Sequence, residues 1–502
     1  MISTIKSLGI NGIGGYPVTA EVYISNGLPG FDIVGLPDTA VKEARERVRA
    51  AVKNSGFRFP QSRVTVNLAP ADTKKIGTVY DLPILIGILA ASGAIRHPGT
   101  DAAFFGELSL SGELRGVQGA LPMAIAAARE GLRRLFVPAE NAGEAAFAEG
   151  VEVYGVKTVR ELIAHLSGET ALSPAAAPEP ALFRGGAPDL ADVKGQENVK
   201  RALEIAAAGG HNLLMIGPPG AGKSMLAKRL PGILPDMSRE EMLESTEIHS
   251  VAGLTSHEVP IVALRPFRAP HHTVSAAGLA GGGSVPRPGE ISLAHNGVLF
   301  LDELPEFNRS VLEALREPME EGKISISRAS GTITWPARFM MGSAMNPCPC
   351  GYAMDPKRTC TCLPEARKRY QEKISGPLLD RIDIQVSVPP VEASQFGRKT
   401  HAESSAEIRK RVCAARDIQR KRFANTAIKT NAEMSSEFAQ SCCKLSRETE
   451  KFAINAADKM GLSARGYYRL LKVGRTIADL RNSDSVEIID LSEALRYRAF
   501  RS

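Results

Sequence analysis

The chain has 502 residues, of which 43% are hydrophobic and 23% are charged. At roughly 100–200 residues per domain this length predicts about two to four domains, and together with the composition it excludes a small disulfide-stapled protein and a chain disordered throughout. Lysine and arginine outnumber aspartate and glutamate by 62 to 55, so an anionic partner is worth considering, although net charge does not determine a fold.

The sequence contains no segment that predicts membrane insertion or secretion. The longest uncharged apolar stretch, Leu82–Ile95, has 14 residues and includes a proline, whereas a membrane helix needs ~20 residues. The first residues lack the charged and apolar parts of a secretory leader. Seven cysteines, an odd number, fit a reducing compartment. We therefore expect a cytoplasmic protein without membrane contact.

Strand and helix signals alternate in residues 1–167. Between Arg63 and Pro70 apolar and polar residues alternate, which predicts a half-buried strand. Asp38 can cap a helix that ends at Gly56, and Leu121–Glu130 is typical of another helix. We predict that residues 1–167 form one α+β domain.

A proline- and glycine-rich segment, residues 168–188, predicts a linker. After it, short apolar runs at Asn212–Met215, Val298–Leu301 and Phe339–Met341 predict the buried strands of a parallel sheet with crossover helices. From His401 onward the pattern is helical and charged. We therefore predict an α/β core over residues 189–400 and a helical domain over residues 401–502.

A phosphate-binding loop follows the first of these strands. The residues from Gly217 to Ser224 satisfy the pattern G-x-x-x-x-G-K-[ST] between an apolar run and a helical segment. Its backbone N–H groups can surround phosphate oxygens at a helix N-terminus, Lys223 would reach the β- and γ-phosphates, and Ser224 would bind Mg²⁺. The predicted nucleotide ligands are Gly217, Pro218, Pro219, Gly220, Ala221, Gly222, Lys223 and Ser224.

Two adjacent carboxylates end the strand at Val298–Leu301. Asp302 would hold the Mg²⁺ through water, and Glu303 would orient and polarise the attacking water, because phosphoryl transfer depends on positioning and charge stabilisation. An apolar run followed by Asp-Glu is a weak signal by itself. It becomes strong when a phosphate loop precedes it.

These motifs resemble those of AAA+ ATPases, and three further residues fit that pattern in its order. Asn346 matches the polar sensor beside the γ-phosphate, Arg381 the arginine finger that enters the neighbouring subunit's site, and Arg465 the second sensor of the helical lid. The resemblance implies ATP hydrolysis with Mg²⁺. It also implies a ring, commonly a hexamer, because a finger supplied in trans leaves every monomer incomplete. The implied catalytic residues are Lys223, Asp302, Glu303, Asn346, Arg381 and Arg465.

Two segments resemble insertions of the magnesium-chelatase and MCM-helicase branch. One contains Phe267–His272, and the other predicts a β-hairpin with strands at Lys323–Ser327 and Thr332–Trp335. In that branch such insertions project into the pore of the ring. Lys323 and Arg328 are therefore candidates for gripping a DNA backbone, and the alternative is that they are exposed charges without a ligand.

Almost the whole chain resembles the ComM/YifB family of magnesium-chelatase-like proteins. Its most distinctive stretches are PADTKKIGTVYDLPI, FFGELSLSGELRGVQGALP and NPCPCGY. The resemblance implies an N-terminal Lon-protease-like domain, an AAA+ core and a helical lid. It also implies ATP-driven DNA branch migration in homologous recombination and natural transformation, with single-stranded or branched DNA and a recombinase as candidate partners. The alternative is a motor or chaperone that acts on a protein without DNA.

Four cysteines follow the sensor asparagine in two CxC pairs. Four thiolates at Cys348, Cys350, Cys360 and Cys362 suit a tetrahedral structural Zn²⁺. The alternative is free or redox-active thiols. Such a zinc knuckle would serve either as a structural staple or as a nucleic-acid contact.

The Lon-like resemblance does not extend to protease residues. Alignment with the Lon pattern places Val79 where the serine nucleophile is expected and Pro122 where the lysine base is expected. Neither side chain can supply this chemistry, so proteolysis is disfavoured. Thr78 is a conceivable but unpaired nucleophile. We expect a structural or DNA-binding domain.

The surplus positive charge lies in the C-terminal region. Residues 401–502 contain 20 lysines and arginines against 13 aspartates and glutamates. In the predicted helix Ile408–Phe423 one face is apolar and the other strongly basic, which fits either a solvated face or a contact with DNA phosphates. The DNA candidates here are Arg420, Lys421 and Arg422.

Overall fold

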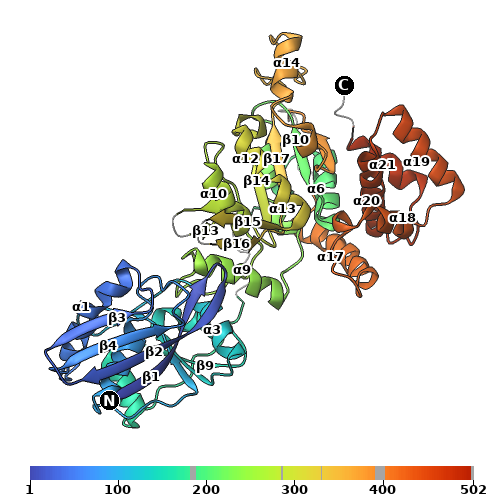
Figure 1. Ribbon diagram of the computed structural model, residues 1–502. Coiled ribbons are helices and arrows are strands. Elements are labelled where there is room, and N and C mark those ends of the chain that lie inside the picture. Colours follow the sequence, from blue (N-terminus) through green and yellow to red (C-terminus); the bar gives the residue numbers. More distant parts are fainter. Residues whose placement is uncertain (181–187, 284–285, 329–330, 391–401, 499–502) are drawn as a thin grey trace. The chain divides into compact units, whose positions relative to one another are not determined.

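The computed structural model describes residues 1–180, 188–283, 286–328, 331–390 and 402–498. The chain packs as two units, each with its own sheet (Figure 1). Unit 1 comprises Met1–Ala181 and Ser238–Ala263, and unit 2 comprises Leu182–Met237 and Leu264–Ser502. Within the described ranges, no helix combines the length and apolar character needed to cross a bilayer.

Unit 1 is built on a seven-stranded mixed sheet in the order β3-β4-β2-β1-β5-β8-β9. The β1–β2 and β2–β4 pairs are antiparallel, and the other neighbours are parallel. The strands of the sheet are β1 (Ile2–Asn11), β2 (Gly14–Ser25), β3 (Gly30–Val34), β4 (Arg63–Ala69), β5 (Ala102–Phe104), β8 (Arg134–Pro138) and β9 (Glu152–Val156). The helices before the linker are α1 (Thr39–Asn54), α2 (Asp81–Ala91), α3 (Ala120–Arg129), α4 (Ala142–Ala145) and α5 (Val159–Ser167), and a small hairpin is formed by β6 (Glu107–Leu108) and β7 (Leu114–Arg115).

The predicted helix after Asp38 is present as α1. The Asp38 carboxylate accepts a hydrogen bond from the Val41 backbone N–H at 2.8 Å, which satisfies a free donor of the first turn. Val41, Val48 and Val52 are fully buried on one face. The mixed α/β character expected for this region therefore follows from local caps and apolar periodicity.

Part of the predicted linker packs against unit 1. The backbone N–H of Ala175 donates to the carbonyl of Val153 in β9 at 2.7 Å, so this part of the segment follows the sheet edge. Residues 181–187 of the predicted linker lie outside the described residues.

A helix from the middle of the chain belongs to unit 1. This helix, α9 (Arg239–Val251), packs against α3. The buried carboxylate of Glu144 accepts hydrogen bonds from the hydroxyls of Ser250 and Thr255, and the backbone carbonyl of Ser250 accepts one from the Gly119 N–H at 3.1 Å. The α/β core that we predicted as one continuous stretch, residues 189–400, therefore donates residues 238–263 to the N-terminal unit.

Unit 2 contains a five-stranded parallel sheet in the order β11-β14-β17-β10-β18. Parallel strands place their carboxyl ends at one edge, so the residues that follow neighbouring strands meet there. The strands are β10 (Leu213–Ile216), β11 (Phe267–Arg268), β14 (Val298–Leu301), β17 (Met340–Met345) and β18 (Ile384–Ser387). This confirms the parallel-sheet core expected from the three apolar runs.

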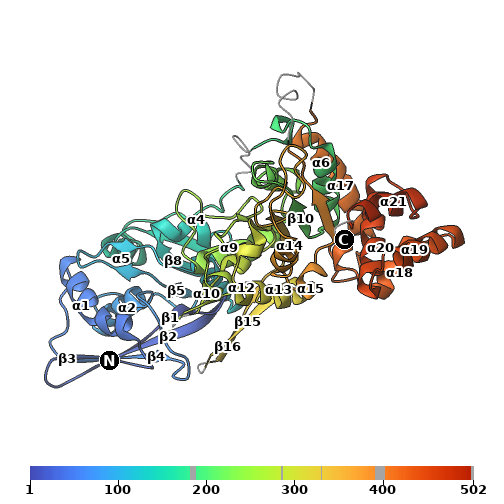
Figure 2. The ribbon, with the colours of Figure 1, turned by 90° about the horizontal axis from the view of Figure 1, so that it is seen from above.

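Short helices and two hairpins surround this sheet. The helices are α6 (Glu197–Gly209), α7 (Lys223–Ala227), α8 (Leu230–Ile233), α10 (Ala276–Ala280), α11 (Glu290–Leu293), α12 (Arg309–Glu313), α13 (Arg316–Glu321), α14 (Pro364–Gln371) and α15 (Gly376–Leu379). The hairpins are β12 (Gly281–Gly282) with β13 (Arg287–Pro288), and β15 (Lys323–Arg328) with β16 (Gly331–Pro336). The β15–β16 hairpin matches the predicted one and projects from the body of the unit (Figure 2).

The C-terminal helices share one apolar core with the parallel sheet. Ile408, Val412 and Leu470 of these helices are buried in the same cluster as Leu213 and Val298 of the sheet. The predicted boundary at residues 400 and 401 lies outside the described residues. The helices are α17 (Ser405–Arg422), α18 (Ser436–Cys443), α19 (Arg447–Lys459), α20 (Ala464–Leu480) and α21 (Ile488–Arg496).

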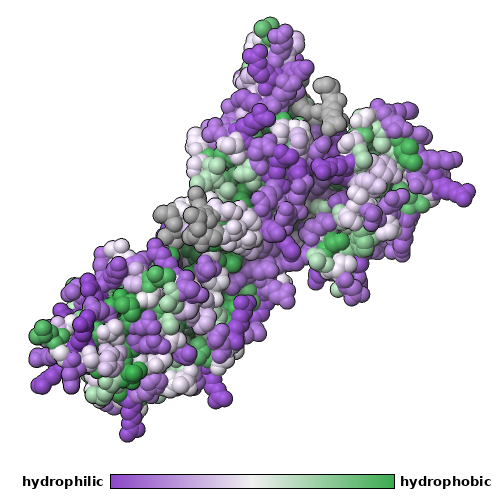
Figure 3. All heavy atoms as spheres, in the orientation of Figure 1, coloured by the Kyte–Doolittle hydropathy of each residue, from purple (hydrophilic) through white to green (hydrophobic). Residues whose placement is uncertain are grey.

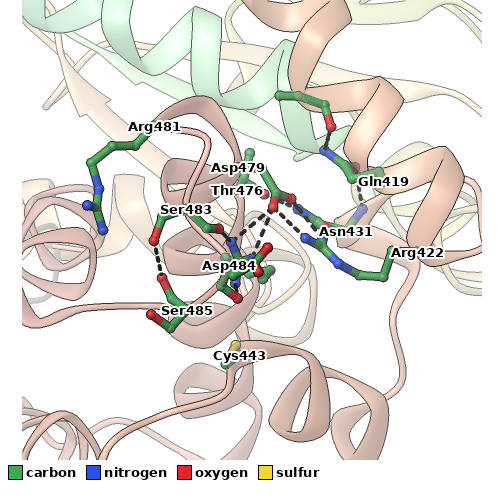
Figure 4. A network of polar contacts seen from close by, with 12 residues as sticks. Gln419, Arg422, Asn431, Cys443, Thr476, Asp479, Arg481, Ser483, Asp484 and Ser485 are labelled. Atoms are coloured by element: carbon green, nitrogen blue, oxygen red, sulfur yellow. Dashed lines mark hydrogen bonds and ion pairs between the residues drawn. The ribbon is translucent and has the colours of Figure 1, made fainter.

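A buried polar network ties these helices together (Figure 4). The carboxylate of Asp479 on α20 accepts from the guanidinium of Arg422 at 2.8 Å, from the side-chain amide of Asn431 at 2.8 Å and from Arg475 at 3.1 Å. Gln419 adds a bond from its amide group to the Ala208 carbonyl of α6 at 2.9 Å. These donors satisfy the hydrogen-bonding capacity of the buried carboxylate. The network therefore fixes how the helices pack against one another.

Candidate nucleotide-binding site

The phosphate loop connects β10 to α7 and depends on glycine at defined positions. Gly220 and Gly222 adopt the left-handed conformation, with φ of 76° and 87°, which favours glycine. A Cβ at Gly217 would lie 2.2 Å from the Val388 carbonyl oxygen. The loop is therefore held in a tight turn that directs its last residues into the first turn of α7.

Lys223 is positioned over this loop by three oxygen atoms. Its Nζ donates to the carbonyls of Gly217 at 2.8 Å and Pro218 at 3.0 Å, and to Oδ1 of Asn346 at 3.1 Å. Burial lowers the pKa of Lys223, and the nearby carboxylates of Asp302 and Glu303 oppose that shift. The predicted phosphate ligand and the predicted sensor are thus in direct contact.

The second half of the site follows β14. The Ser224 hydroxyl donates a hydrogen bond to Oδ2 of Asp302, and Oδ1 of Asp302 accepts from the Glu303 N–H at 3.0 Å. Glu303 itself has φ of 53°, in the left-handed region, and its Oε2 lies 3.4 Å from Nδ1 of His272. Glu303, the residue assigned as the base, therefore has an unusual backbone conformation, and its carboxylate lies beside an imidazole.

One cleft of about 340 Å³ is lined by the loop residues from Pro219 to Met225 together with Asp302, Glu303, Met345 and Asn346. A glycine loop that presents backbone N–H groups, a lysine and a helix N-terminus suit the phosphates of a nucleotide. A serine hydroxyl beside an aspartate offers the hard oxygen ligands that Mg²⁺ prefers. The residues present therefore fit ATP with Mg²⁺.

The two predicted arginines do not line this cleft. The Arg381 side chain is only 9% exposed and pairs with Glu320, and its Nη1 donates to the Pro377 carbonyl at 2.7 Å. Arg465 is exposed in the first turn of α20. Within one chain the structure thus brings together Lys223, Asp302, Glu303 and Asn346, and leaves both arginines apart from them.

The four predicted zinc ligands converge. The sulfur atoms of Cys348, Cys350, Cys360 and Cys362 all lie within 4.8 Å of one another, and the Cys350 N–H donates to Sγ of Cys362 at 3.3 Å. The N–H of Tyr352 helps to lower the pKa of the Cys350 thiol to about 5. A tetrad of thiols with one stabilised thiolate fits a tetrahedral Zn²⁺.

This cysteine cluster lies against the nucleotide cleft. Gly351 has φ of 86°, and a Cβ there would lie 2.5 Å from Cδ of Pro219 in the phosphate loop. The buried hydroxyl of Tyr370, at the end of α14, accepts a hydrogen bond from the Asn346 N–H. Burial and the charges of Glu306 and Glu303 raise the pKa of Tyr370 to about 12. The outer surface of α14 is largely hydrophilic (Figure 3). The cluster therefore packs on both the loop and the sensor.

Comparison with known proteins gives matches along the chain. The family models described as magnesium chelatase, subunit ChlI; subunit ChlI of Mg-chelatase; and magnesium chelatase, subunit ChlI C-terminal match residues 189–396, 20–141 and 402–498. The uncharacterized protein YifB of Salmonella typhimurium is 47% identical over 99% of this chain and 97% of its own length. The competence protein ComM of Haemophilus influenzae is 46% identical over 99% of this chain and 97% of its own length.

The chain belongs to the ComM/YifB family of magnesium-chelatase-like proteins. Membership places it among AAA+ ATPases and supports ATP hydrolysis at the cleft. The predicted family is therefore confirmed, whereas the match to Lon protease of Acinetobacter baumannii is weak, with 28% identity over 32% of this chain and 21% of that protein.

The residues at the positions of the Lon protease serine and lysine make packing and hydrogen-bond contacts within the fold of this ComM/YifB chain. Val79 is buried, Pro122 lies in α3, and the Thr78 hydroxyl donates to Oε2 of Glu107 at 2.6 Å. The buried ammonium of nearby Lys75 donates to the carbonyls of Pro70 and Thr73. In these contacts the Thr78 hydroxyl is bound to a glutamate and the Lys75 ammonium to backbone carbonyls, so they do not pair Thr78 with a lysine base.

Three arginines of the basic helix α17 bind groups within the fold. Arg411 pairs with Glu204 of α6 and with Glu403, and Arg416 donates to the Ala207 carbonyl at 2.8 Å. Arg422 is only 18% exposed and binds Asp479. The guanidinium of Arg422, which we named as a DNA candidate, is therefore engaged by an internal carboxylate.

The other DNA candidates are more exposed. Arg420 is 73% exposed and pairs with Asp417, Lys421 is exposed, and Lys323 is 52% exposed and lies 3.3 Å from Glu321. The backbone of Arg328 belongs to β15, but its side chain lies outside the described residues.

Sequence reasoning missed several residues at this ComM/YifB site. It noted the FRAPHH stretch without assigning His272, and it did not identify Gly351 or Tyr370. The signal for His272 is its place after β11, since β11 pairs with β14 and β14 leads to Glu303. Gly351 follows Cys350 directly, but nothing in the sequence indicates that it contacts Pro219.

Proposed function

We propose that the protein is a ring-forming AAA+ ATPase that couples ATP hydrolysis to movement along DNA, as a helicase or branch-migration motor in homologous recombination and natural transformation. The observation that carries the ATPase part is the joining of Lys223 to Asn346 and of Ser224 to Asp302 in one cleft. The DNA part rests on the likeness to the competence protein ComM over 99% of the chain.

Each residue of the cleft has a defined task in this proposal. Lys223 and the loop N–H groups bind the β- and γ-phosphates, and Ser224 and Asp302 hold Mg²⁺, which supplies charge neutralisation when bound. Glu303 orients and polarises the attacking water, and Asn346 contacts the γ-phosphate. Because Lys223 already donates a hydrogen bond to Asn346, the ammonium of the phosphate loop and the sensor amide hold each other in position.

The experiment that tests the DNA function is an ATP-driven junction assay. The purified chain is incubated with ATP, Mg²⁺ and a labelled three-stranded or four-way DNA junction, and strand products are separated on a gel. We expect resolution of the junction that requires ATP hydrolysis. An ATPase indifferent to DNA that leaves junctions intact would contradict the proposal, and would favour the alternative of a motor or chaperone that acts on a protein partner without DNA.

In this proposal Arg381 acts in the nucleotide site of a neighbouring subunit, which requires a ring of subunits. Arg465 acts in the lid of its own subunit. We expect the Arg381–Glu320 pair to open when subunits associate, because the guanidinium is otherwise engaged. Two inactive variants, Lys223→Ala and Arg381→Ala, are mixed and assayed. Recovery of ATPase activity supports a finger supplied in trans, and no recovery at any ratio contradicts it.

The cysteine cluster is proposed to hold a structural Zn²⁺. The four sulfur atoms lie close enough to share one ion, and zinc bound by four thiolates leaves no open position for catalysis. The contact of Gly351 with Pro219 favours the structural staple over a nucleic-acid contact. Metal analysis of the purified chain tests this assignment.

A further inference from the structure

The two edges of the seven-stranded sheet in unit 1 differ in what lies beside them. At the β9 edge the N–H of Ala175 donates to the Val153 carbonyl at 2.7 Å, so a segment of the chain itself follows that strand. At the opposite edge, β3 pairs with β4 alone among the described residues (Figure 1). An edge strand presents backbone N–H and C=O groups with which a further strand can pair. We propose that the β3 edge binds an extended acidic segment of a partner protein as an added strand.

A basic cavity of about 410 Å³ lies along this edge. It is lined by Asp32, Ile33 and Val34 of β3, by Arg63 and Thr65 of β4, and by Lys42 and Arg45 of α1. Arg63 is paired with Asp32 at 3.1 Å, whereas the side chains of Lys42 and Arg45 are exposed. Three basic side chains thus face a single carboxylate. Such a lining favours a segment that carries acidic side chains, because complementary charge selects the partner.

Exposed apolar side chains lie at both ends of the same strand. Leu28, just before β3, is 89% exposed, Val34 at the end of β3 is 46% exposed, and Leu36 just beyond it is 54% exposed. The side chains of a strand point alternately to opposite faces. A segment that alternates acidic and apolar residues would therefore offer partners to the basic cavity and to these apolar groups at once.

Other occupants fit this edge less well. Pairing of β3 with the β3 strand of a second copy would bring Lys42 and Arg45 of both chains together, and like charges oppose that arrangement. Pairing with the β9 strand of a second copy would compete with the segment that contains Ala175. A nucleic acid would match the basic side chains, but its phosphates would meet the strand carbonyls and Asp32. An extended peptide uses the backbone groups for affinity and the side chains for specificity.

Fluorescence anisotropy with the full-length chain tests the proposal. The probe is a labelled peptide of about ten residues that alternates glutamate and valine. Methylation of every backbone nitrogen of the peptide should weaken binding at least about tenfold, because it removes the strand donors and keeps the charges. Lysine in place of every glutamate should also weaken binding at least about tenfold. Amide hydrogen exchange with saturating peptide should slow over Gly30–Val34 and stay unchanged over Glu152–Val156.

Charge reversal of the chain gives the matched comparison. Lys42→Glu/Arg45→Glu should weaken binding of the glutamate peptide about tenfold. The control Lys53→Glu/Lys157→Glu changes the net charge equally at exposed lysines of unit 1 that do not line the cavity, and should change affinity less than about twofold.

Four outcomes would overturn the inference. They are no binding of the glutamate peptide, equal affinity of its methylated form, equal effects of the two double variants, and unchanged exchange over Gly30–Val34. Binding of a single strand of about twenty thymidines that is lost in Lys42→Glu/Arg45→Glu, without binding of the peptide, would instead assign the cavity to nucleic acid.

Discussion

The hydroxyl of Ser224 donates a hydrogen bond to the carboxylate of Asp302, although the two residues lie 78 positions apart in the chain. The strand order places β17 between β10 and β14, so this bond spans two strands that are not neighbours. The bond from Lys223 to Asn346 joins the same loop to the strand in between. Three strand ends are thereby connected through side chains whose chemistry suits ATP and Mg²⁺.

Lys223→Ala and Glu303→Gln should separate nucleotide binding from hydrolysis. Removal of the ammonium deletes the charge that faces the phosphates, so Lys223→Ala should lose ATP binding. Glu303→Gln keeps the shape of the side chain and removes the base, so it should bind ATP and lower kcat by roughly 10²-fold. Lys228→Ala, an exposed lysine just beyond the same loop, is the control. Normal turnover by Glu303→Gln would show that another group activates water.

Gly351→Ala should weaken ATP binding without removing any polar group. The new Cβ would lie 2.5 Å from Cδ of Pro219 at a φ of 86°, so either the phosphate loop or the cysteine cluster must move. We expect about tenfold weaker nucleotide affinity and a cost in unfolding free energy of about 1–2 kcal/mol. Gly376→Ala is the matched control, because its Cβ meets no atom within 4 Å. Equal affinity in both variants would mean that the cluster and the loop are mechanically independent.

Much of the nucleotide site could be predicted from sequence because its signals are local. The phosphate loop, the carboxylates after β14 and the asparagine after β17 each follow an apolar strand, and parallel strands end at one edge of a sheet. Which side chains meet at that edge follows from the topology alone. The His272–Glu303 contact needed the pairing of β11 with β14, which no local pattern gives.

Other features depended on contacts between distant residues. The periodicity of α17 identified its buried face, but it could not reveal that Asp479 would bind Arg422 or that Ala207 would bind Arg416. The helix α9 has an ordinary capping box at Ser238. Its place in unit 1 involves hydrogen bonds from Ser250 and Thr255 to Glu144, which lies more than a hundred residues earlier in the chain.

The cysteine cluster should bind one zinc ion per chain. Cys348→Ser removes a ligand from the tetrad and should abolish stoichiometric zinc, measured by mass spectrometry of the purified protein, whereas Cys413→Ser in α17 should retain it. Because the cluster packs on Pro219, removal of the metal with a chelator should also weaken nucleotide binding. A metal-free chain with four readily reactive thiols and normal ATP binding would support the free-thiol alternative.

Arg422→Ala should destabilise the fold, unlike its neighbour Arg420→Ala. Asp479 is fully buried and is bound by Arg422, so truncation leaves a buried carboxylate with fewer donors and should cost about 3 kcal/mol of unfolding free energy. Arg420 and Asp417 are 73% and 54% exposed, and such surface pairs contribute about 0–1 kcal/mol. Chemical denaturation of both variants measures the difference. Equal midpoints would mean that Arg475 and Asn431 suffice to compensate Asp479.

The remaining exposed cations should reveal where single-stranded DNA binds. Each phosphate contact that is lost should lower the slope of log affinity against log salt by roughly 0.7. The double variant Arg420→Ala/Lys421→Ala tests the basic helix, Lys323→Ala tests the hairpin, and Lys459→Ala at the exposed end of α19 is the control. Because the hairpin that begins at Lys323 projects from the body of its unit, we expect the larger change in slope for Lys323→Ala. A larger change in the double variant would place the DNA on the C-terminal helices instead.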